Sequence, residues 1–226
     1  MTRVKICGIT ALDDAHQAAE LGAWALGMIF WPQSPRACPV EQAEAIGAQL
    51  HRRLEVAGVF VNATLDHVAE MADVCRLTLL QLHGEEGPAY CQEAARRTGC
   101  KVMKAARVHD AAQVQSLRAF RTDFHLLDAH SPKAPGGTGE SFDWELARLH
   151  PGTPPMVLSG GLTPDDVGEA IATAGPFAVD SASGTEAEPG RKDPAKVTAF
   201  FRAVEAADQV PVVGEAAGGA RGGASG

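Results

Sequence analysis

Cys7, Arg36 and Asp128 are three residues whose side chains could together carry acid–base chemistry on an anionic substrate. A cysteine thiolate can remove a proton, and a carboxyl group can donate one. An arginine can hold a planar carboxylate through two parallel hydrogen bonds, which a lysine cannot do. Each residue also has a simpler interpretation: a small buried apolar side chain, a solvated loop arginine and an exposed capping carboxylate. The choice depends on whether the fold brings them to one place.

The sequence around two of these residues places them at strand ends. Cys7 ends a short apolar segment, Gly8 lets the backbone change direction, and Thr10 is positioned to cap the helix expected over 11–21. Asp128 ends the apolar segment 124–127 in the same way. In parallel α/β proteins the carboxyl ends of the strands form the edge where ligands bind. Both side chains are therefore expected at a binding edge, where partial desolvation would raise the pKa of the Asp128 carboxyl and suit it to proton donation.

Two clusters of small residues late in the chain are candidates for an anion site. Gly160 and Gly161 form the first, and Ser181–Gly184 forms the second. Glycines let backbone N–H groups approach an anion closely, and the last two loops of a parallel barrel often hold a phosphate in this way. The simpler interpretation is that these residues only turn the chain. Their positions after the seventh and eighth expected strands favour a phosphate site.

The elements that would position these residues alternate regularly along the 226 residues. Eight short apolar segments of strand length are each followed by a segment with helical spacing or helix-start signals. Eight such units, with strands apolar throughout, predict a single-domain α/β fold, the closed (βα)8 TIM barrel, with an open doubly wound sheet as the main alternative. The expected strands are 4–7, 25–30, 56–61, 77–82, 101–106, 124–127, 156–158 and 177–179, and the expected helices are 11–21, 39–50, 64–74, 88–98, 110–117, one from about 143, 163–174 and 194–205.

The composition narrows the classes of function. The formal net charge is -8 without a basic cluster, so neither nucleic acid nor an anionic membrane is an expected partner. Five cysteines without a CxxC pair argue against a disulfide framework and a structural zinc site, and the absence of an apparent signal peptide or membrane-spanning run favours a cytoplasmic enzyme. The barrel is expected over 1–207. Residues 208–226 are expected to form a disordered Gly/Ala-rich tail, because from Gly214 onward it has no aromatic or branched apolar residue to bury.

Seven short segments occur together and in order along the chain: Lys5–Thr10, Gly58–Asn62, Gln81–Gly84, Leu126–Asp128, Gly137–Gly139, Leu158–Leu162 and Arg191–Asp193. As a set they give the sequence a strong resemblance to the phosphoribosylanthranilate isomerases of tryptophan biosynthesis. The resemblance covers about 3–206 and is far more specific than any one segment.

The resemblance implies a (βα)8 barrel that converts N-(5-phosphoribosyl)anthranilate into 1-(2-carboxyphenylamino)-1-deoxyribulose 5-phosphate by a cofactor-free Amadori rearrangement. It implies no metal site, and a small phosphosugar-anthranilate as the only partner of a monomer or homodimer. The implied roles are Cys7 as general base, Asp128 as general acid, Arg36 as the binder of the anthranilate carboxylate, His83 and Asp180 as pocket-lining residues, and Gly160, Gly161, Ala182 and Ser183 as the phosphate site. One departure is the order Ser181-Ala182, where the family usually has Val-Ser, which puts one hydroxyl contact to phosphate in doubt.

Two other interpretations stay open at this level. Another phosphosugar barrel, such as an indoleglycerol phosphate synthase or a sugar-phosphate epimerase, would share the phosphate loops, although the synthase should carry a catalytic lysine at a strand end. A catalytically silent barrel could bind a phosphorylated metabolite or a partner protein instead. The combination of Cys7, Arg36 and Asp128 favours an active isomerase.

Overall fold

Eight parallel strands close into a barrel in the computed structural model, which describes residues 1–128 and 144–209. Neighbouring strands in the chain are neighbours in the sheet, and β8 closes the ring by pairing with β1. This arrangement confirms the expected (βα)8 barrel and excludes the open doubly wound sheet. The strands are β1 (Arg3–Cys7), β2 (Ala25–Ile29), β3 (Glu55–Phe60), β4 (Leu79–Leu82), β5 (Lys101–Arg107), β6 (Phe124–Asp128), β7 (Met156–Ser159) and β8 (Ala178–Ser181).

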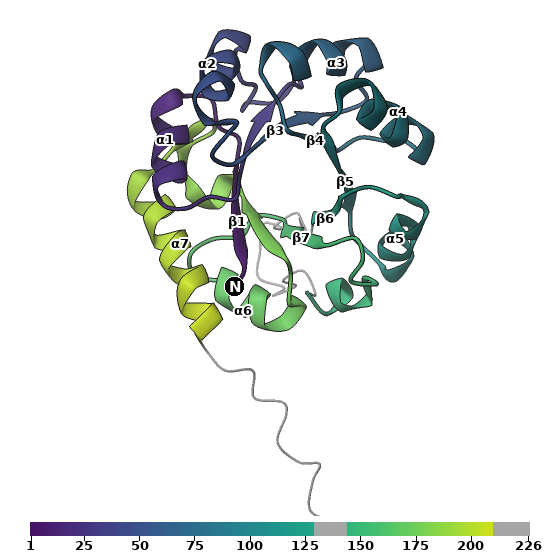
Figure 1. Cartoon of the computed structure of the whole chain (residues 1–226). Helices are drawn as coiled ribbons and strands as arrows, with labels where there is room; N and C mark the ends of the chain where they lie inside the picture. The colour runs from purple at the N-terminus through teal and green to yellow at the C-terminus, as the bar shows by residue number, and fades with distance from the viewer. Residues whose placement is uncertain (129–143, 210–226) are drawn as a thin grey trace, which may run out of the picture.

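The helices form a ring outside the strands, and the last helix, α7, lies beside both α1 and α6 (Figure 1). The segment before β7 forms a 3₁₀ helix, η2, rather than a full α-helix. The helices are α1 (Leu12–Glu20), α2 (Val40–Leu50), α3 (Leu65–Val74), α4 (Pro88–Thr98), α5 (Ala111–Ser116), η1 (Leu117–Ala119), η2 (Trp144–Leu149), α6 (Val167–Ala174), η3 (Ser183–Thr185) and α7 (Pro194–Gln209).

The expectation that Thr10 caps the first helix is wrong. The N-cap of α1 is Ala11, which makes no side-chain capping bond. The Thr10 hydroxyl donates instead to the carbonyl oxygen of Gly190. Gly190 lies between β9 (Glu186–Glu188) and β10 (Arg191–Lys192), a small antiparallel hairpin after β8 that the sequence pattern did not indicate. The hydroxyl therefore joins the first loop of the barrel to this hairpin.

The C-terminal helix is longer than expected. It continues to Gln209, and Asp208 accepts hydrogen bonds of 2.6 and 2.8 Å from the backbone N–H and the hydroxyl of Thr2. Asp208 and Gln209 thus belong to the barrel rather than to the expected tail. The rest of that tail, 210–226, and the Gly137–Gly139 segment lie outside the described residues.

The barrel interior changes from apolar to polar along its axis. A small core that includes Leu79, Met103 and Leu126 fills it, with Trp24, Phe124 and Phe177 packed edge to face or tilted at its amino-terminal end. Farther along, the interior holds buried polar side chains, among them Lys5, Gln81 and Asp180. Alternate residues of a strand share a face, so Cys7 follows Lys5 on the interior side of β1. The polar half of the interior therefore leads to the carboxyl edge of the strands.

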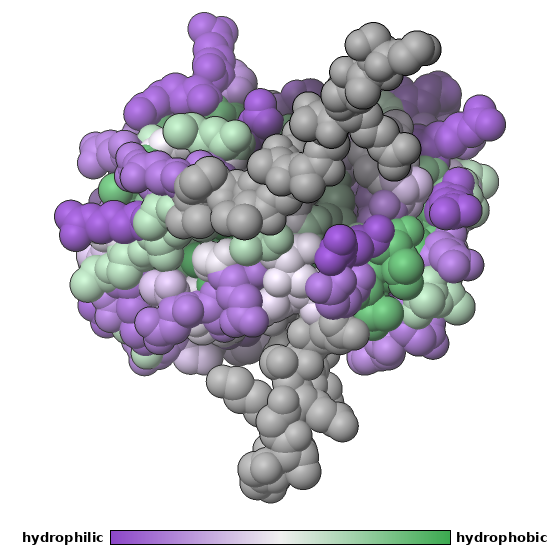
Figure 2. All heavy atoms as spheres, turned by 90° about the horizontal axis from the view of Figure 1, so that it is seen from below, coloured by the Kyte–Doolittle hydropathy of each residue, from purple (hydrophilic) through white to green (hydrophobic). Residues whose placement is uncertain are grey.

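Between the strands and the helices lies a second, larger apolar core. Ile6, Leu80, Leu82 and Val179 are the outward-facing partners of the interior residues and are fully buried there. Figure 2 shows hydrophilic side chains over much of one side of the molecule, with apolar ones between them. Within 1–128 and 144–209, no helix combines the length and the apolar character needed to cross a membrane.

A chain of hydrogen bonds between two histidines joins β6 to the segment after η2. The N–H of Gly152 donates to His150 Nδ1, His150 Nε2 lies 2.9 Å from His125 Nδ1, and His125 Nε2 lies 3.2 Å from the carbonyl oxygen of Phe120. Since Gly152 donates to Nδ1 of His150, the only consistent assignment has each imidazole donating through Nε2. Both rings are neutral in this arrangement. Burial lowers the pKa of His125, and burial together with the neighbouring His125 lowers the pKa of His150 to about 4.

The histidine pair predicts a loss of stability in mild acid. Because the pKa of His150 is lower in the folded protein than its ordinary value of 6.5, the unfolded chain binds more protons between those two values. The free energy of unfolding should fall by about 1–2 kcal/mol between about pH 7 and pH 5 from this residue, with allowance for its partial exposure. Urea unfolding at the two pH values should show a smaller fall in His150→Gln than in the wild type. The control variant His109→Gln changes an exposed histidine and should show the same fall in the free energy of unfolding as the wild type. An equal fall in all three proteins would contradict the prediction.

Candidate active site

Cys7 lies at the carboxyl end of β1, next to a buried ion pair. The side chain of Lys5, two residues earlier, is fully buried, and its Nζ lies 3.0 Å from Oδ1 of Asp180 on β8. The register of the barrel makes this contact, because Lys5 and Asp180 are Cα partners across the β1–β8 closure. The hydroxyl of Ser159 on β7 donates to the second oxygen of Asp180 at 3.5 Å. Three strands thus contribute to the polar cluster of Lys5, Asp180 and Ser159.

Cys7 itself is buried, with 6% of its surface exposed. Burial raises the pKa of its thiol, and this effect outweighs the opposing influence of the Lys5 charge. In the protein without substrate the sulfur is therefore predominantly a neutral thiol at neutral pH, and the thiolate is the minor form. A base at this position depends on the charges that stabilise that minor form.

Asp128, at the end of β6, accepts a hydrogen bond from a histidine on the loop after β4. Nε2 of His83 lies 3.2 Å from Asp128 Oδ2, and Nδ1 of His83 lies 3.0 Å from the side-chain nitrogen of Gln81. With the Gln81 amide as donor, Nδ1 is the acceptor and Nε2 carries the proton that goes to Asp128. Gln81 is 1% exposed, and its position on the interior face of β4 fixes the orientation of the ring. His83 and Asp128 are each about one-fifth exposed, so both face the edge of the barrel.

Arg36, in the loop after β2, is held by Glu186 of the β9–β10 hairpin. Its Nε and one terminal nitrogen donate to the two carboxylate oxygens at 2.8–3.0 Å. These hydrogen bonds raise the pKa of the Arg36 guanidinium. Burial disfavours ionisation of Glu186, but the hydrogen bonds from Arg36 and the charge of Lys192 together lower its pKa. Arg36 and Glu186 are thus both charged, and one edge of the guanidinium fork is occupied.

The occupied edge determines how Arg36 can meet a substrate. A guanidinium presents two bidentate edges to carboxylates, the Nε side and the pair of terminal nitrogens. Because Glu186 takes the Nε side, the terminal pair is the edge that can face a second carboxylate. Glu186 is in turn 3.3 Å from Nζ of Lys192, and Lys192 also donates to the carbonyl oxygen of Ala182. The hairpin therefore connects Arg36 to the loop after β8.

The loops after β7 and β8 pack tightly against each other. Gly160 and Gly161 have φ values of +119° and +77°, which an L side chain rarely adopts. A Cβ on Gly184 would lie 1.9 Å from the carbonyl oxygen of Leu162, so only glycine fits at that position. The hydroxyl of Ser181 donates to the same oxygen at 2.7 Å. Ser181 therefore holds the two loops together, and Ala182 and Ser183 follow it at the start of η3.

The structure brings every residue named for the site to the carboxyl edge of the barrel or its loops. Cys7 and Asp128 lie on different sides of the ring, because β7 and β8 separate β6 from β1 on the shorter way round. Lys5, Gln81 and Glu186 are functional candidates that the sequence reasoning missed. Among the described residues, no cluster of three or more His, Cys, Asp or Glu side chains is arranged to hold a metal ion.

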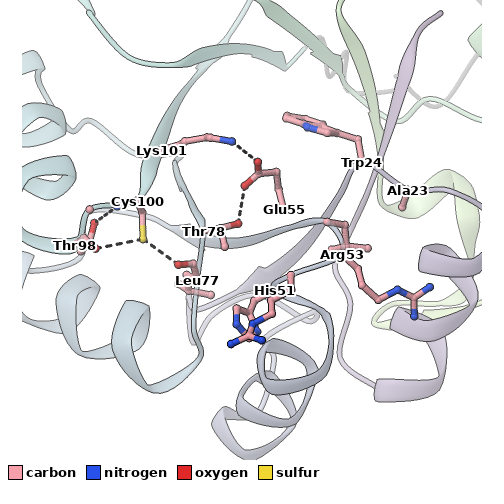
Figure 3. A pocket seen from close by; sticks show the side chains of 13 residues that line it. Ala23, Trp24, His51, Arg53, Glu55, Leu77, Thr78, Thr98, Cys100 and Lys101 are labelled. Carbon is pink, nitrogen blue, oxygen red and sulfur yellow. Dashed lines mark hydrogen bonds and ion pairs between the residues drawn. The ribbon is translucent and has the colours of Figure 1, made fainter.

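A pocket of about 660 Å³ lies at the opposite end of the barrel, between the loops that precede β2, β3, β4 and β5. In Figure 3, Lys101 reaches Glu55, and Glu55 accepts a hydrogen bond from Thr78. The carboxylate of Glu55 is thereby paired with Lys101 of the same pocket. The amino-terminal face of such barrels usually serves stability rather than catalysis, and none of the residues proposed for the site from the sequence lines this pocket.

Comparisons with known proteins agree with the geometry. A family model described as N-(5'-phosphoribosyl)anthranilate (PRA) isomerase matches residues 4–203. The N-(5'-phosphoribosyl)anthranilate isomerase of Geobacter metallireducens is 48% identical over 206 residues, which are 91% of this chain and 100% of that protein.

Solved structures extend the likeness to three dimensions. The phosphoribosyl anthranilate isomerase of Thermotoga maritima is 38% identical and superposes with a TM-score of 0.80, over 91% of this chain and all of the other. A phosphoribosyl anthranilate isomerase in complex with reduced 1-(o-carboxyphenylamino)-1-deoxyribulose 5-phosphate is 37% identical, with a TM-score of 0.78 over the same shares of the two chains.

Proposed function

Since the chain belongs to the phosphoribosylanthranilate isomerase family and is an isomerase of tryptophan biosynthesis, we propose that it works by an Amadori rearrangement with Cys7 as base and Asp128 as acid. The observation that supports this most is the placement of the two groups. A thiol with a lysine ammonium nearby and a carboxyl group bonded to a histidine end two different strands at the same barrel edge. Two separate groups suit a reaction that needs proton transfer at two different atoms.

The substrate would be held at its two charged ends. The terminal nitrogens of Arg36 would bind the anthranilate carboxylate, with the guanidinium fixed in place by Glu186. The phosphate would lie on backbone N–H groups of Gly160, Gly161, Ala182 and Ser183. Because Ser181 donates its hydroxyl to Leu162, the reversed order Ser181-Ala182 would leave the backbone, and not this hydroxyl, to contact the phosphate. Asp180 and His83 would line the space between.

The reaction would begin at the ribose ring. Asp128 gives its proton to the ring oxygen, the bond from C1′ to that oxygen breaks, and the nitrogen lone pair forms a protonated Schiff base. The positive nitrogen acidifies the C2′ proton, and Cys7 as thiolate removes it. The C2′–H electrons form the C1′=C2′ bond while the C1′=N electrons return to nitrogen. The resulting enolamine tautomerises to the ketone, and the two side chains exchange protons with solvent before the next turnover.

The direct test of this function is the conversion of N-(5-phosphoribosyl)anthranilate by the purified protein. Product should accumulate as 1-(2-carboxyphenylamino)-1-deoxyribulose 5-phosphate without any added metal or cofactor, and a chelator should not slow it. When the reaction is run in ²H₂O, deuterium should enter only positions that the rearrangement reprotonates. A protein that binds the substrate without converting it would contradict the proposal.

Replacing Arg36 with Met should raise KM strongly. The change removes a charge-assisted, bidentate contact worth about 2–3 kcal/mol, so the affinity for a reduced product analogue should fall by roughly two orders of magnitude. Calorimetric titration with the analogue measures this directly. Arg53→Met, which changes an exposed arginine at the other end of the barrel (Figure 3), is the matched control. An unchanged affinity in Arg36→Met would show that Arg36 contacts Glu186 but does not bind the substrate carboxylate.

A further inference from the structure

We propose that Lys5 is a positioning residue for the Cys7 base: its ammonium, fixed by Asp180 and given room by Gly27, is the counter-cation of the Cys7 thiolate. The inference rests on the proposed role of Cys7, and it adds two residues, Lys5 and Gly27, to the machinery of the reaction. It also gives Asp180 a second task, since the carboxylate that holds the ammonium also determines how much of its charge reaches the sulfur.

Without such a role, burying the side chain of Lys5 would only cost folding free energy. A lysine in the interior of a barrel loses its hydration, and burial alone lowers the pKa of its ammonium. Here the side chain is 0% exposed, and the net effect is nevertheless a raised pKa, because Asp180 and Cys7 both favour the charged form. The ammonium is therefore charged at neutral pH. Its hydrogen-bond partner is Asp180 Oδ1 at 3.0 Å, and the side chain of Cys7, two residues along the same strand, also favours its charged form.

Gly27, on the neighbouring strand β2, leaves the space in which the two groups meet. It is the register partner of Cys7. A Cβ at this position would lie 2.7 Å from the Cys7 sulfur and 2.9 Å from Lys5 Nζ, both well inside contact distance. The φ angle of Gly27 is not in the positive region, so the backbone does not require glycine. A glycine inside a strand weakens it and commonly marks a close approach, and here the groups that approach are the sulfur and the ammonium.

The other charges around the thiol affect its pKa less strongly than Lys5 does. Lys5 on β1 and Lys192 on β10 lower the pKa of Cys7, and Asp180 on β8 raises it. Arg36, which also faces Cys7, has its charge compensated by Glu186. Lys192 shares that same carboxylate, and burial lowers its own pKa. After burial of the thiol, the charge of Lys5 is the largest influence on Cys7, and it opposes burial.

The experiment measures the thiol directly and needs no turnover. The rate at which iodoacetamide alkylates Cys7, followed by mass spectrometry of the Cys7 peptide across neutral and alkaline pH, reports the thiolate fraction, because only the thiolate displaces iodide. In Lys5→Met the alkylation rate at neutral pH should fall by about tenfold or more, which corresponds to an upward shift of the thiol pKa by about one unit. In Asp180→Asn the rate should rise instead. A merely structural disturbance would not give opposite signs in two variants that break the same ion pair.

Two further variants keep the test decisive if Lys5→Met folds poorly. The double variant Lys5→Met/Asp180→Asn buries no unpaired charge, and its alkylation should still be slower than that of the wild type, because Lys5 acts on the sulfur more strongly than Asp180 does. Gly27→Ala keeps both charges but separates the groups, and it should also slow alkylation. The control is Lys104→Met, which removes a lysine 5% exposed, paired with Glu86 at 3.0 Å on the β4–β5 side of the barrel. The titration of Cys7 in Lys104→Met should match that in the wild type.

Steady-state kinetics provide an independent measurement. In Lys5→Met, kcat should fall more than KM rises, and the loss should be recovered in part at alkaline pH, where the thiolate forms without help. A Cys7 titration that is identical in wild type, Lys5→Met and Gly27→Ala would overturn the inference. If alkylation shifts as expected but Cys7→Ala still turns over normally, the proposed function fails while the electrostatic coupling stands, so the two failures can be told apart.

Discussion

Replacing Cys7 with alanine is expected to remove nearly all turnover while the protein still binds its substrate. In the proposed mechanism the sulfur acts only in the chemical step, so its loss should lower kcat by about 10²–10⁴-fold, the usual contribution of a positioned acid or base, with little change in the affinity for a product analogue. The measurements are steady-state kinetics for kcat and calorimetric titration for affinity. The methyl side chain of alanine leaves Lys5 and Asp180 paired, so the charge of the site is preserved.

A matched control for this experiment is Cys91→Ala. Cys91 lies on α4, is 2% exposed and packs in the outer core, so it is as buried as Cys7 but remote from the carboxyl edge. Its loss should cost some stability and leave kcat unaltered. Near-normal kcat in Cys7→Ala would remove the cysteine from the mechanism, whatever the control shows.

Asp128→Asn is the second change expected to have a large effect, and its signature is a change in the shape of the pH profile. If the free enzyme needs a protonated Asp128 and a deprotonated Cys7, kcat/KM of the wild type should rise and fall with pH as a bell. Unperturbed Asp and Cys titrate near pH 3.9 and about 8.5, in the order that leaves both groups in the unproductive form at neutral pH. Activity then depends on a minor protonation state. Burial of Cys7 raises the pKa of its thiol further, which makes that dependence stronger.

Asparagine should remove the limb of the bell that belongs to the acid, together with most of the activity. It can still accept the hydrogen bond that His83 donates to Asp128, so the geometry of the loop after β4 is retained. The residual rate should follow the ionisation of Cys7 alone. Asp123→Asn is the control, since Asp123 immediately precedes the same strand and accepts a hydrogen bond from the N–H of Val102 far from the edge. An Asp128→Asn profile that keeps both limbs, and that Cys7→Ser does not alter, would exclude both residues.

The alternation of short apolar and helical segments was sufficient to predict the barrel. Strand ends came within two residues at Cys7, Leu82 and Asp128, because in a parallel barrel the strands are buried on both faces and stand out as apolar runs. The first residues of the helices were harder to predict. The segment from Thr163 has a good start signal, yet α6 begins at Val167, since Asp166 accepts a hydrogen bond from the N–H of Thr163 and holds a turn there first.

The residues of the candidate site that follow strands could be named from the sequence, and those that depend on distant contacts were missed. Glu186 has no local signal, because its partner Arg36 lies 150 residues away. Lys5 and Gln81 did carry a signal: a charged or amide side chain inside an apolar strand of a closed barrel is buried on either face, so it needs a polar partner. The pairing of Lys5 with Asp180 could not be predicted from the sequence, because it depends on the register between β1 and β8.

That register also has a consequence for how the enzyme comes into being on the ribosome. Lys5 is synthesised 175 positions before Asp180. Until β8 has left the exit tunnel, the ammonium has no carboxylate to accompany it into an apolar interior, and β1 has one open side. Closure of the ring and completion of the electrostatic environment of Cys7 are therefore the same event. A nascent or truncated chain that stops before β8 has neither, so the proton abstraction that we propose for Cys7 would require a chain that includes β8.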